Sequence, residues 1–171
     1  VVNIGNMMYS TTYNVYTAPE GYPYSNDYNI FKNNVINNPE GGGGMCQAIT
    51  VYGSHNIIDN NTVNGGTGIH KQCGTGEEKY NNTYSNNKIY NGNTFETFKN
   101  STVVNNIVII SRSMSLSQDS IGYNNTVSGS LSVGYNVVAY NNTVQGSFSV
   151  YTNATAYDNI VNGETTIDGS N

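Results

Sequence analysis

The sequence of 171 residues contains no tryptophan, three prolines and two cysteines, and only 10 % of its residues are charged. An average soluble domain has about 25 % charged residues. Six Lys and Arg side chains against eleven Asp and Glu give a net charge of −5. This balance excludes the basic surface with which DNA- and RNA-binding proteins contact phosphates. Because both charge and proline are scarce, the composition also differs from that of a disordered chain.

Long apolar runs are absent as well. The longest run, Ile107 to Ile110, has the length of a strand, whereas a membrane-spanning helix needs about 18 apolar residues. We therefore expect no membrane span. The chain begins with Val1 rather than Met and is rich in Asn, Ser, Thr and Tyr. These features suit a processed, secreted protein, and we expect an extracellular or cell-surface location.

A repeat is the most informative feature of the sequence. The pattern Tyr-Asn-Asn-Thr-Val at 123–127 recurs at 140–144 and, as Tyr-Asp-Asn-Ile-Val, at 157–161, always 17 residues apart. Looser copies begin at Asp59, Tyr80 and Val104, and Lys32 begins an earlier one. Residues 1–29 are irregular and rich in tyrosine, and we expect them to form the first coil and a contact segment. We therefore divide the chain into this first segment (1–29) and a repeat region (30–171) that is most regular over 123–171.

Apolar residues within each repeat alternate with polar ones, which is the pattern of a strand with one face buried. A unit of 17 residues cannot bury its apolar row alone, but a stack of such units can. Stacking also pairs the backbone groups of each unit with those of the next. The sequence therefore predicts an all-β fold, a parallel β-solenoid of about seven or eight coils, with essentially no α-helix.

Positions that share an offset in the repeat are expected to form ladders at a corner of the solenoid. Asn tolerates the left-handed backbone of a sharp corner, and its amide can bond the amide of the next coil. The alternative is that these Asn are turn residues without a ladder. The predicted ladder residues are Asn61, Asn82, Asn106, Asn125, Asn142 and Asn159, beside a column of Tyr80, Tyr123, Tyr140 and Tyr157.

The segment from His55 to Ile69, with Asp-Asn-Asn-Thr-Val at 59–63, resembles repeats of the right-handed, pectate-lyase-like parallel β-helix class. That class includes polysaccharide lyases, glycoside hydrolases, phage tailspikes and adhesin-like surface proteins. The 17-residue tail resembles the short coils of autotransporter passengers and adhesins. In style, the Asn- and Tyr-rich composition is similar to surface and sheath proteins of methanogenic archaea. The resemblance implies the coil architecture but no particular function, because the fold is a scaffold.

Enzymes of this fold use clusters of carboxylates on one face of the coils, and a glycosidase needs two about 5–9 Å apart. One stretch of this chain could supply such a pair, with histidines beside it. Its members are Asp59, either Glu77 or Glu78, His55, His70 and Lys71. The alternative, which we favour, is that they are scattered solvated side chains. We expect no catalytic residues, no metal site and no cofactor.

Arg112 is the only arginine, and it has the parity of the apolar residues Val108 and Ile110. Strict alternation would point it inward, where a guanidinium needs a partner. Either a corner intervenes at this position, or Arg112 pairs with an acid such as Asp119.

Cys46 and Cys73 are separated by about one long coil. Stacked strands lie about 4.8 Å apart, close to the lower range of Cα separations that a disulfide accepts. A disulfide between adjacent coils is our first interpretation, and a bond between subunits or two free thiols are the alternatives. A zinc site is disfavoured because these cysteines and the two histidines match no finger spacing.

Six Asn-x-Thr glycosylation sequences occur, which is about the number that composition alone predicts. They begin at Asn60, Asn81, Asn100, Asn124, Asn141 and Asn153. Their number is therefore no evidence for glycosylation, although exposure at a solenoid corner would permit it.

A solenoid has two rims of unpaired strand groups, which natural solenoids usually cap. The sequence contains no recognisable cap, and the last repeat runs only from Asp158 to Asn171. We therefore expect a structural protein that self-assembles by end or edge pairing into a cell-surface filament, sheath or layer. The expected partner is a further copy of the chain, with surface polysaccharide as a second candidate. The alternative function is a carbohydrate-binding or carbohydrate-cleaving β-helix protein, namely a lyase, a hydrolase or a fragment of an adhesin.

Overall fold

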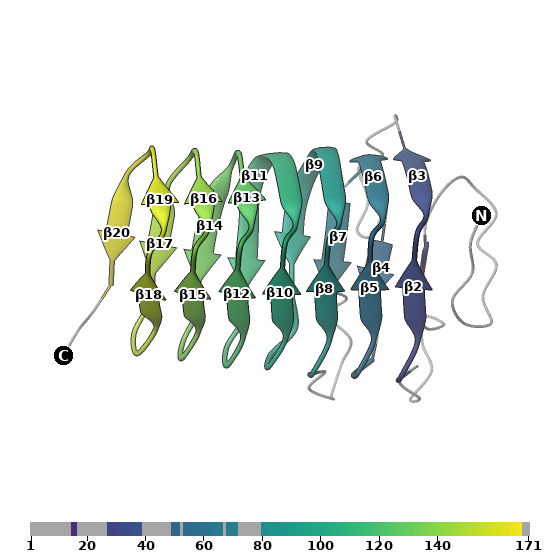
Figure 1. The fold of residues 1–171 in the computed structure, drawn as a ribbon, viewed down its shortest axis with the longest axis horizontal. Helices are drawn as coiled ribbons and strands as arrows, with labels where there is room; N and C mark the ends of the chain where they lie inside the picture. The colour runs from purple at the N-terminus through teal and green to yellow at the C-terminus, as the bar shows by residue number, and fades with distance from the viewer. Residues whose placement is uncertain are drawn as a thin grey trace.

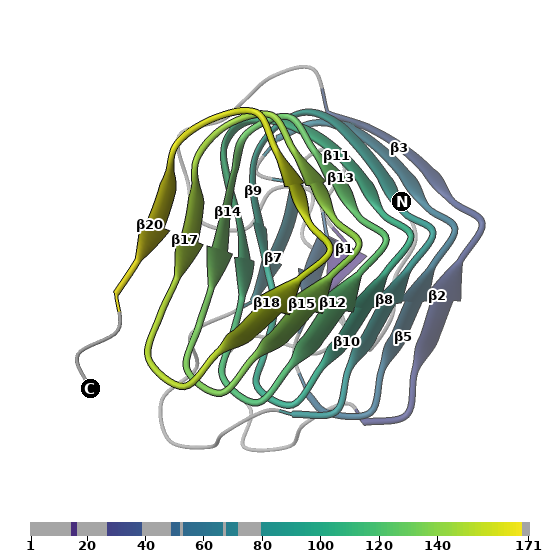
Figure 2. The same cartoon turned by 60° about the vertical axis from the view of Figure 1, so that its left-hand side comes forward.

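The computed structural model describes residues 15–16, 27–38, 49–51, 53–66, 68–71 and 80–168, and every regular element in these ranges is a β-strand. All the strand pairs between them are parallel, and the coils stack into a single solenoid (Figures 1 and 2). The predicted fold class, an all-β parallel β-solenoid, is confirmed. Cys46, Cys73, Glu77 and Glu78 lie outside the described residues, as does most of the first segment.

Each coil passes through three faces. Face 1 is a seven-stranded sheet with one strand from each of seven coils. Its strands are β2 (Ile30–Lys32), β5 (Ile57–Asp59), β8 (Thr83–Ser85), β10 (Thr102–Val104), β12 (Ile121–Tyr123), β15 (Val138–Tyr140) and β18 (Thr155–Tyr157).

A second, 13-stranded sheet forms faces 2 and 3, because β9 (Lys88–Glu96) and β11 (Ile107–Leu116) run through both. Face 2 also contains β3 (Val35–Asn38), β6 (Thr62–Gly65), β13 (Thr126–Val127), β16 (Thr143–Val144) and β19 (Ile160–Val161). Face 3 contains β1 (Val15–Tyr16), β4 (Ile49–Val51), β7 (Gly68–Lys71), β14 (Ser130–Val133), β17 (Phe148–Val150) and β20 (Thr165–Ile167).

The coils shorten along the chain. On face 2, Val35 pairs with Thr62 and Thr62 with Lys88, so the first coils take 27 and 26 residues. Thr126 pairs with Thr143, and Thr143 with Ile160, so the last coils take 17. The sequence alignment, which matched Tyr80–Tyr84 with 59–63, was wrong at this copy: Asp59 pairs with Ser85. Two corners of each coil have similar Asn-rich sequences. The repeat pattern therefore matched residues of one corner with residues of the other.

Two corners of each coil are made by a single residue with positive φ. In the part of the chain that the structure describes, fifteen residues other than glycine have positive φ, and all but Asn91 begin a corner. The corner before face 2, which we call corner A, begins at Asn33, Asn60, Asn86, Asn105, Asn124, Asn141 or Asp158. The corner before face 1, corner B, begins at Tyr28, His55, Asn81, Asn100, Asp119, Asn136 or Asn153. Asn and Asp dominate both lists because they adopt the left-handed conformation at least cost.

The alternate residues of each strand fill the interior in columns. Face 2 contributes Val63, Ile89, Val108, Val127 and Val144, all fully buried. On face 1 the inward side chains shrink towards the C-terminus, from Tyr84 and Val103 to Gly122 and Ala139. A Cβ at Gly122 would collide with the Leu116 side chain. The shorter coils enclose a smaller interior, and these smaller side chains fit into it.

Arg112 is exposed. Of the two interpretations of its position, the one that places a corner there is correct. Between Ile110 and Ser113, β11 has two residues where β9 has only Asn93, and the register shifts there. This extra residue breaks the alternation that would have turned Arg112 inward.

Tyr84 is fully buried on β8 and packs edge to face against Phe95, with ring centroids 5.7 Å apart. Among the described residues, its hydroxyl has no hydrogen-bond partner of good geometry, although the nearby Phe98 backbone partly offsets the effect of burial on its pKa. Burial raises the pKa of Tyr84 far above its ordinary value. A buried hydroxyl without a partner loses its hydration and gains little in return.

We therefore expect Tyr84→Phe to unfold at the same temperature as the parent or a few degrees higher, a gain of up to about 1 kcal/mol. Thermal unfolding followed by circular dichroism measures this. Val103→Ala, which removes buried methyl groups in the next coil, serves as a destabilising control. A loss of stability in Tyr84→Phe would show that the hydroxyl is hydrogen-bonded after all.

Candidate functional site

A ladder of asparagine side chains lines corner A along all seven coils. Its members are Asn34, Asn61, Asn87, Asn106, Asn125, Asn142 and Asn159. Five of the six predicted ladder residues lie in it, and Asn82 does not. Asn34 and Asn87 were missed. Two consecutive Asn before an alternating strand, as at 33–34 and 86–87, were the signal that could have found them.

The five inner rungs of the ladder, from Asn61 to Asn142, share one set of bonds. The Asn125 Nδ2 donates to the Val103 carbonyl and to the Asn142 Oδ1, each at 3.0 Å. The Asn125 backbone N–H donates to the same Asn142 Oδ1 at 3.0 Å. In turn, the Asn125 Oδ1 accepts from the backbone N and the Nδ2 of Asn106. The buried amide is therefore fully satisfied, which is the condition for placing a polar row inside a core.

Corner B has a shorter ladder of its own, and Asn82 belongs to it. The Asn29 and Asn56 backbone N–H groups donate to the Oδ1 atoms of Asn56 and Asn82, each at 2.9 Å. Further along, the Ser101 N–H donates to the Ser120 Oγ at 3.1 Å. In the last two coils the position is taken by Val137 and Ala154. Polar rungs therefore give way to apolar ones in the shorter coils.

Three of the four predicted tyrosines form one stack on face 1. Tyr123 and Tyr140 stack with centroids 4.9 Å apart, and Tyr140 and Tyr157 with centroids 5.1 Å apart. Desolvation, with a contribution from Tyr123 and Tyr157, raises the pKa of Tyr140. The prediction for Tyr80 was wrong. Tyr80 lies before corner B, with its ring edge-on to His55, because its copy of the motif belongs to that corner.

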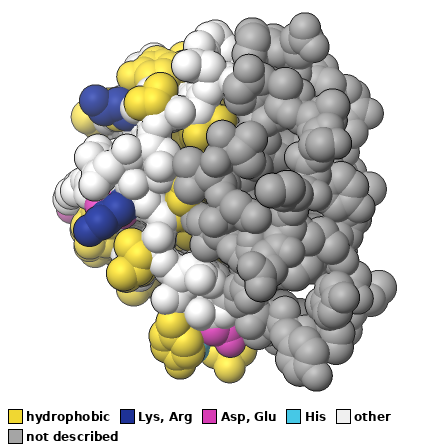
Figure 3. Space-filling model, turned by 90° about the vertical axis from the view of Figure 1, so that its right-hand side faces the viewer, with side chains coloured by type: hydrophobic (Ala, Val, Ile, Leu, Met, Phe, Trp, Pro, Cys, Tyr) yellow, Lys and Arg dark blue, Asp and Glu magenta, His cyan; other side chains and the backbone are white. Residues whose placement is uncertain are grey.

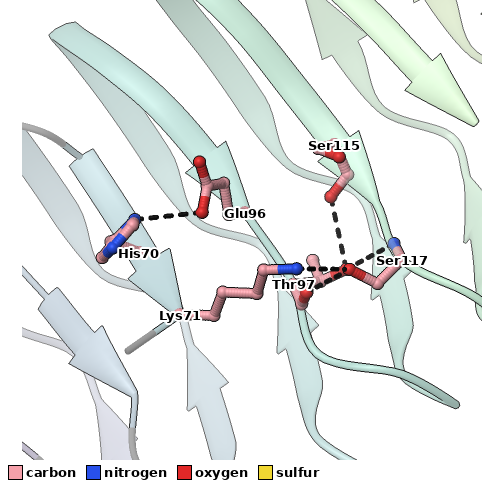
Figure 4. A network of polar contacts seen from close by, with 6 residues as sticks. All are labelled: His70, Lys71, Glu96, Thr97, Ser115 and Ser117. Carbon is pink, nitrogen blue, oxygen red and sulfur yellow. Dashed lines mark hydrogen bonds and ion pairs between the residues drawn. The ribbon is translucent and has the colours of Figure 1, made fainter. Parts of the chain in front are cut away.

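A polar cluster on face 3 brings three ionisable side chains together, those of His70, Lys71 and Glu96 (Figure 4). The His70 Nδ1, on β7, lies 3.1 Å from the Glu96 Oε2, on β9. The neighbouring Lys71 crosses a coil, and its Nζ donates to the Ser117 Oγ at 3.2 Å. Ser117 is also bonded to Thr97, whose Oγ1 accepts from the Ser117 N–H at 3.1 Å. The hydrogen bond from His70, aided by the charges of His70 and Lys71, lowers the pKa of Glu96 against the effect of desolvation.

Glu96→Gln is expected to lower stability at neutral pH by about 1 kcal/mol or less, because the pair is partly solvated. The pKa of Glu96 is lowered in the folded protein, so its contribution is present above the ordinary pKa of a Glu and is lost as the pH falls through the folded value. Urea unfolding between pH 3 and pH 7 should therefore show the parent and the variant converging at the acid end. A difference that does not depend on pH would contradict this assignment.

Of the other candidate catalytic residues, the two that the structure describes, Asp59 and His55, lie apart from this cluster. Asp59 lies on face 1, where it accepts hydrogen bonds from the Ser85 Oγ at 2.7 Å and the Asn86 Nδ2 at 2.8 Å. These two bonds lower the pKa of Asp59. His55 lies at corner B, stacked on Tyr28 with centroids 4.7 Å apart. Within the described ranges, no group of three or more His, Cys, Asp or Glu side chains could hold a metal ion.

Parallel coils, two polar corner ladders and an aromatic stack define the chain as a parallel β-solenoid repeat protein. No protein family, no curated protein and no solved structure matches it. Among the described residues there is no helix of the length and apolarity needed to span a membrane.

Proposed function

We propose that the protein is a structural, extracellular protein that self-assembles through the rim of its solenoid into a cell-surface filament, sheath or layer. The resemblance of its repeats to adhesin-like parallel β-helix proteins, and of its style to archaeal surface and sheath proteins, agrees with this function. Catalysis has no part in it. The observation that carries the proposal is the rim formed by β18, β19 and β20.

The last described coil repeats the inward columns but leaves them uncovered. Val144 and Val150 are buried in the coil before, whereas their counterparts Val161 and Ile167 are not, and Ile167 is 73 % exposed. Among the described residues, the strands of this coil pair on one side only. An open rim of this kind is a template for further strands.

The corner ladder is also incomplete at this rim. Every earlier rung donates its backbone N–H and Nδ2 to the Asn of the next coil, as Asn142 does to the Asn159 Oδ1 at 3.0 Å. Asn159 has no such acceptor among the described residues, and its Nδ2 bonds only the Ala139 carbonyl. A second copy of this chain, whose surface offers Asn-rich corners and strand edges, is the partner that we propose. Only 10 % of the residues in the chain are charged. In the described part of the molecule seen in Figure 3, acidic and basic side chains stand singly among hydrophobic and uncharged ones. Charge repulsion against association is therefore weak.

Light scattering across a hundredfold range of concentration, with negative-stain electron microscopy, tests the proposal. We expect ordered oligomers from the parent chain and at least a tenfold weaker association from Ile167→Lys, which puts a charge on the rim. Ile121→Lys is the matched control, because Ile121 is an exposed isoleucine on face 1 away from the rim. A parent chain that stays monomeric, or equal effects of the two variants, would refute rim assembly.

A second candidate function is polysaccharide binding on face 3, and the polar cluster of His70, Glu96 and Lys71 is the observation that favours it. Outward serines at 115, 132 and 149 continue the row of Glu96 along the coils. Glycan-array binding by the parent, lost in Glu96→Gln, would support this function. Binding that persists in the variant would place any glycan site elsewhere.

A further inference from the structure

The residue two positions after the start of each corner is the first residue of a strand. Across the fourteen corners this position is occupied by Thr, Ile, Val or Lys, so the fold accepts several side chains there. Thr occupies it in six corners, at Thr62, Thr83, Thr102, Thr126, Thr143 and Thr155.

The identity of this residue is associated with that of the corner residue. All six Thr follow an Asn with positive φ, and these Asn are Asn60, Asn81, Asn100, Asn124, Asn141 and Asn153. The four corners that begin with another residue, namely Tyr28, His55, Asp119 and Asp158, all continue with Ile instead. Corner geometry accounts for Asn but not for the Thr two residues later. Asn-x-Thr is the acceptor sequence for N-linked glycosylation.

The placement of these six Asn suits a covalently attached glycan. They have φ between 50° and 59°, and all are exposed except Asn81, which is half-buried. Each of the six coils from β5 onward contains one of them, either at corner A or at corner B. The inward ladder position is the next residue, so a glycan on the corner amide would leave the ladder bonds intact. The side chains of Asn124 and Asn141 make no hydrogen bond in the described part of the chain.

We propose that these six corners are N-glycan attachment sites, so that the edges of the solenoid carry oligosaccharide while its three faces stay bare. The inference rests on the extracellular location in the proposed function. The donor is an oligosaccharide linked to a polyprenyl phosphate, presented by a membrane oligosaccharyltransferase. The Asn Nδ2 forms a bond to the anomeric carbon, the bond from that carbon to the phosphate oxygen breaks, and the phosphate leaves with the electron pair. One Nδ2 proton is released, and no oxidant or reductant is needed.

Spacing predicts which sites are occupied together. Asn124 and Asn141 are neighbours in one column, as are Asn81 and Asn100, and adjacent coils lie about 4.8 Å apart. Two branched glycans cannot both attach freely at that distance. In the columns of Asn60 and Asn153, the adjacent coils contain no further Asn-x-Thr site. We expect full occupancy at Asn60 and Asn153, and one glycan in each neighbouring pair.

The test is expression of the chain behind a secretion signal in a host that has oligosaccharyltransferase. Mass spectrometry of glycopeptides and the gel shift on enzymatic deglycosylation then count the attached glycans, in the medium and in the secretory compartments. About four glycans per chain are expected. Thr62→Val should remove one glycan and leave the unfolding temperature unchanged, because Val35 occupies the equivalent position in the first coil.

Asn33, Asn86, Asn105 and Asn136 provide an internal control, because they begin corners with a similar φ, between 56° and 62°, but lack the Thr two residues later. They should remain unmodified. A folded, secreted chain without glycans would overturn the proposal. Assembly is measured on unglycosylated chain made in a host without the transferase. Failure of self-assembly and failure of glycosylation are therefore separate results.

Discussion

Asn125→Asp is expected to destabilise the protein by about 3–5 kcal/mol at neutral pH. The carboxylate has nearly the shape of the amide but cannot donate a hydrogen bond. It would face the Val103 carbonyl and the Asn142 Oδ1, which now accept from the Asn125 Nδ2. The side chain is buried, so water cannot replace the lost donors. Urea unfolding monitored by circular dichroism measures the change in free energy.

Asn124→Asp is the matched control for this experiment. Asn124 is the exposed corner residue next to Asn125, and Asp158 is found at the equivalent corner two coils later. A change within about 0.5 kcal/mol is expected there. If both variants lose the same stability, added negative charge is responsible rather than the broken ladder.

Gly146→Ala is expected to cost about 2–3 kcal/mol through steric overlap. Gly129, Gly146 and Gly163 are stacked where the chain turns from face 2 to face 3, and the Gly146 N–H bonds the Gly129 carbonyl at 3.2 Å. A Cβ at 146 would lie 2.7 Å from the Gly129 O and 2.8 Å from its carbonyl carbon. Backbone atoms, unlike a flexible side chain, cannot move aside. The coil would have to separate from its neighbour at this point.

Differential scanning calorimetry of Gly146→Ala should show a midpoint lowered by about 5–10 °C. Gln145→Ala, at the exposed position next to it, should change the midpoint little. An unchanged midpoint in Gly146→Ala would mean that the coils have room to separate at this corner.

The fold was predictable because two features of the sequence both follow from the stacking of coils. Apolar and polar residues alternate along each strand, and Asn recurs at the corners. The ladder was predictable only where the coils have equal length. Asn125, Asn142 and Asn159 follow one another at 17 residues, so simple alignment places them together. Between Asn61 and Asn87 the step is 26 residues, and the motif beginning at Tyr80 competes with the true match.

The polar cluster could not be predicted in the same way. His70 and Glu96 meet only because β7 is aligned with the second half of β9, after a corner where Gly68 approaches Gly92 closely. The contact of Lys71 with Ser117 reaches across the coil that contains Thr97, whose carbonyl accepts a hydrogen bond from the Ser117 Oγ. Such contacts depend on exact coil lengths, which composition and periodicity do not fix.

The asparagine ladder has a consequence for the whole molecule, because its bonds from one Asn side chain to the next all run in one sense. From Asn34 to Asn142, each Nδ2 donates to the Oδ1 of the Asn in the next coil, so each Oδ1 from Asn61 to Asn159 accepts from the coil before it. Seven side-chain dipoles are therefore aligned along one edge and polarise one another. These dipoles make the molecule polar along its axis. A fibre built from it would therefore have two chemically different ends and could grow faster at one of them.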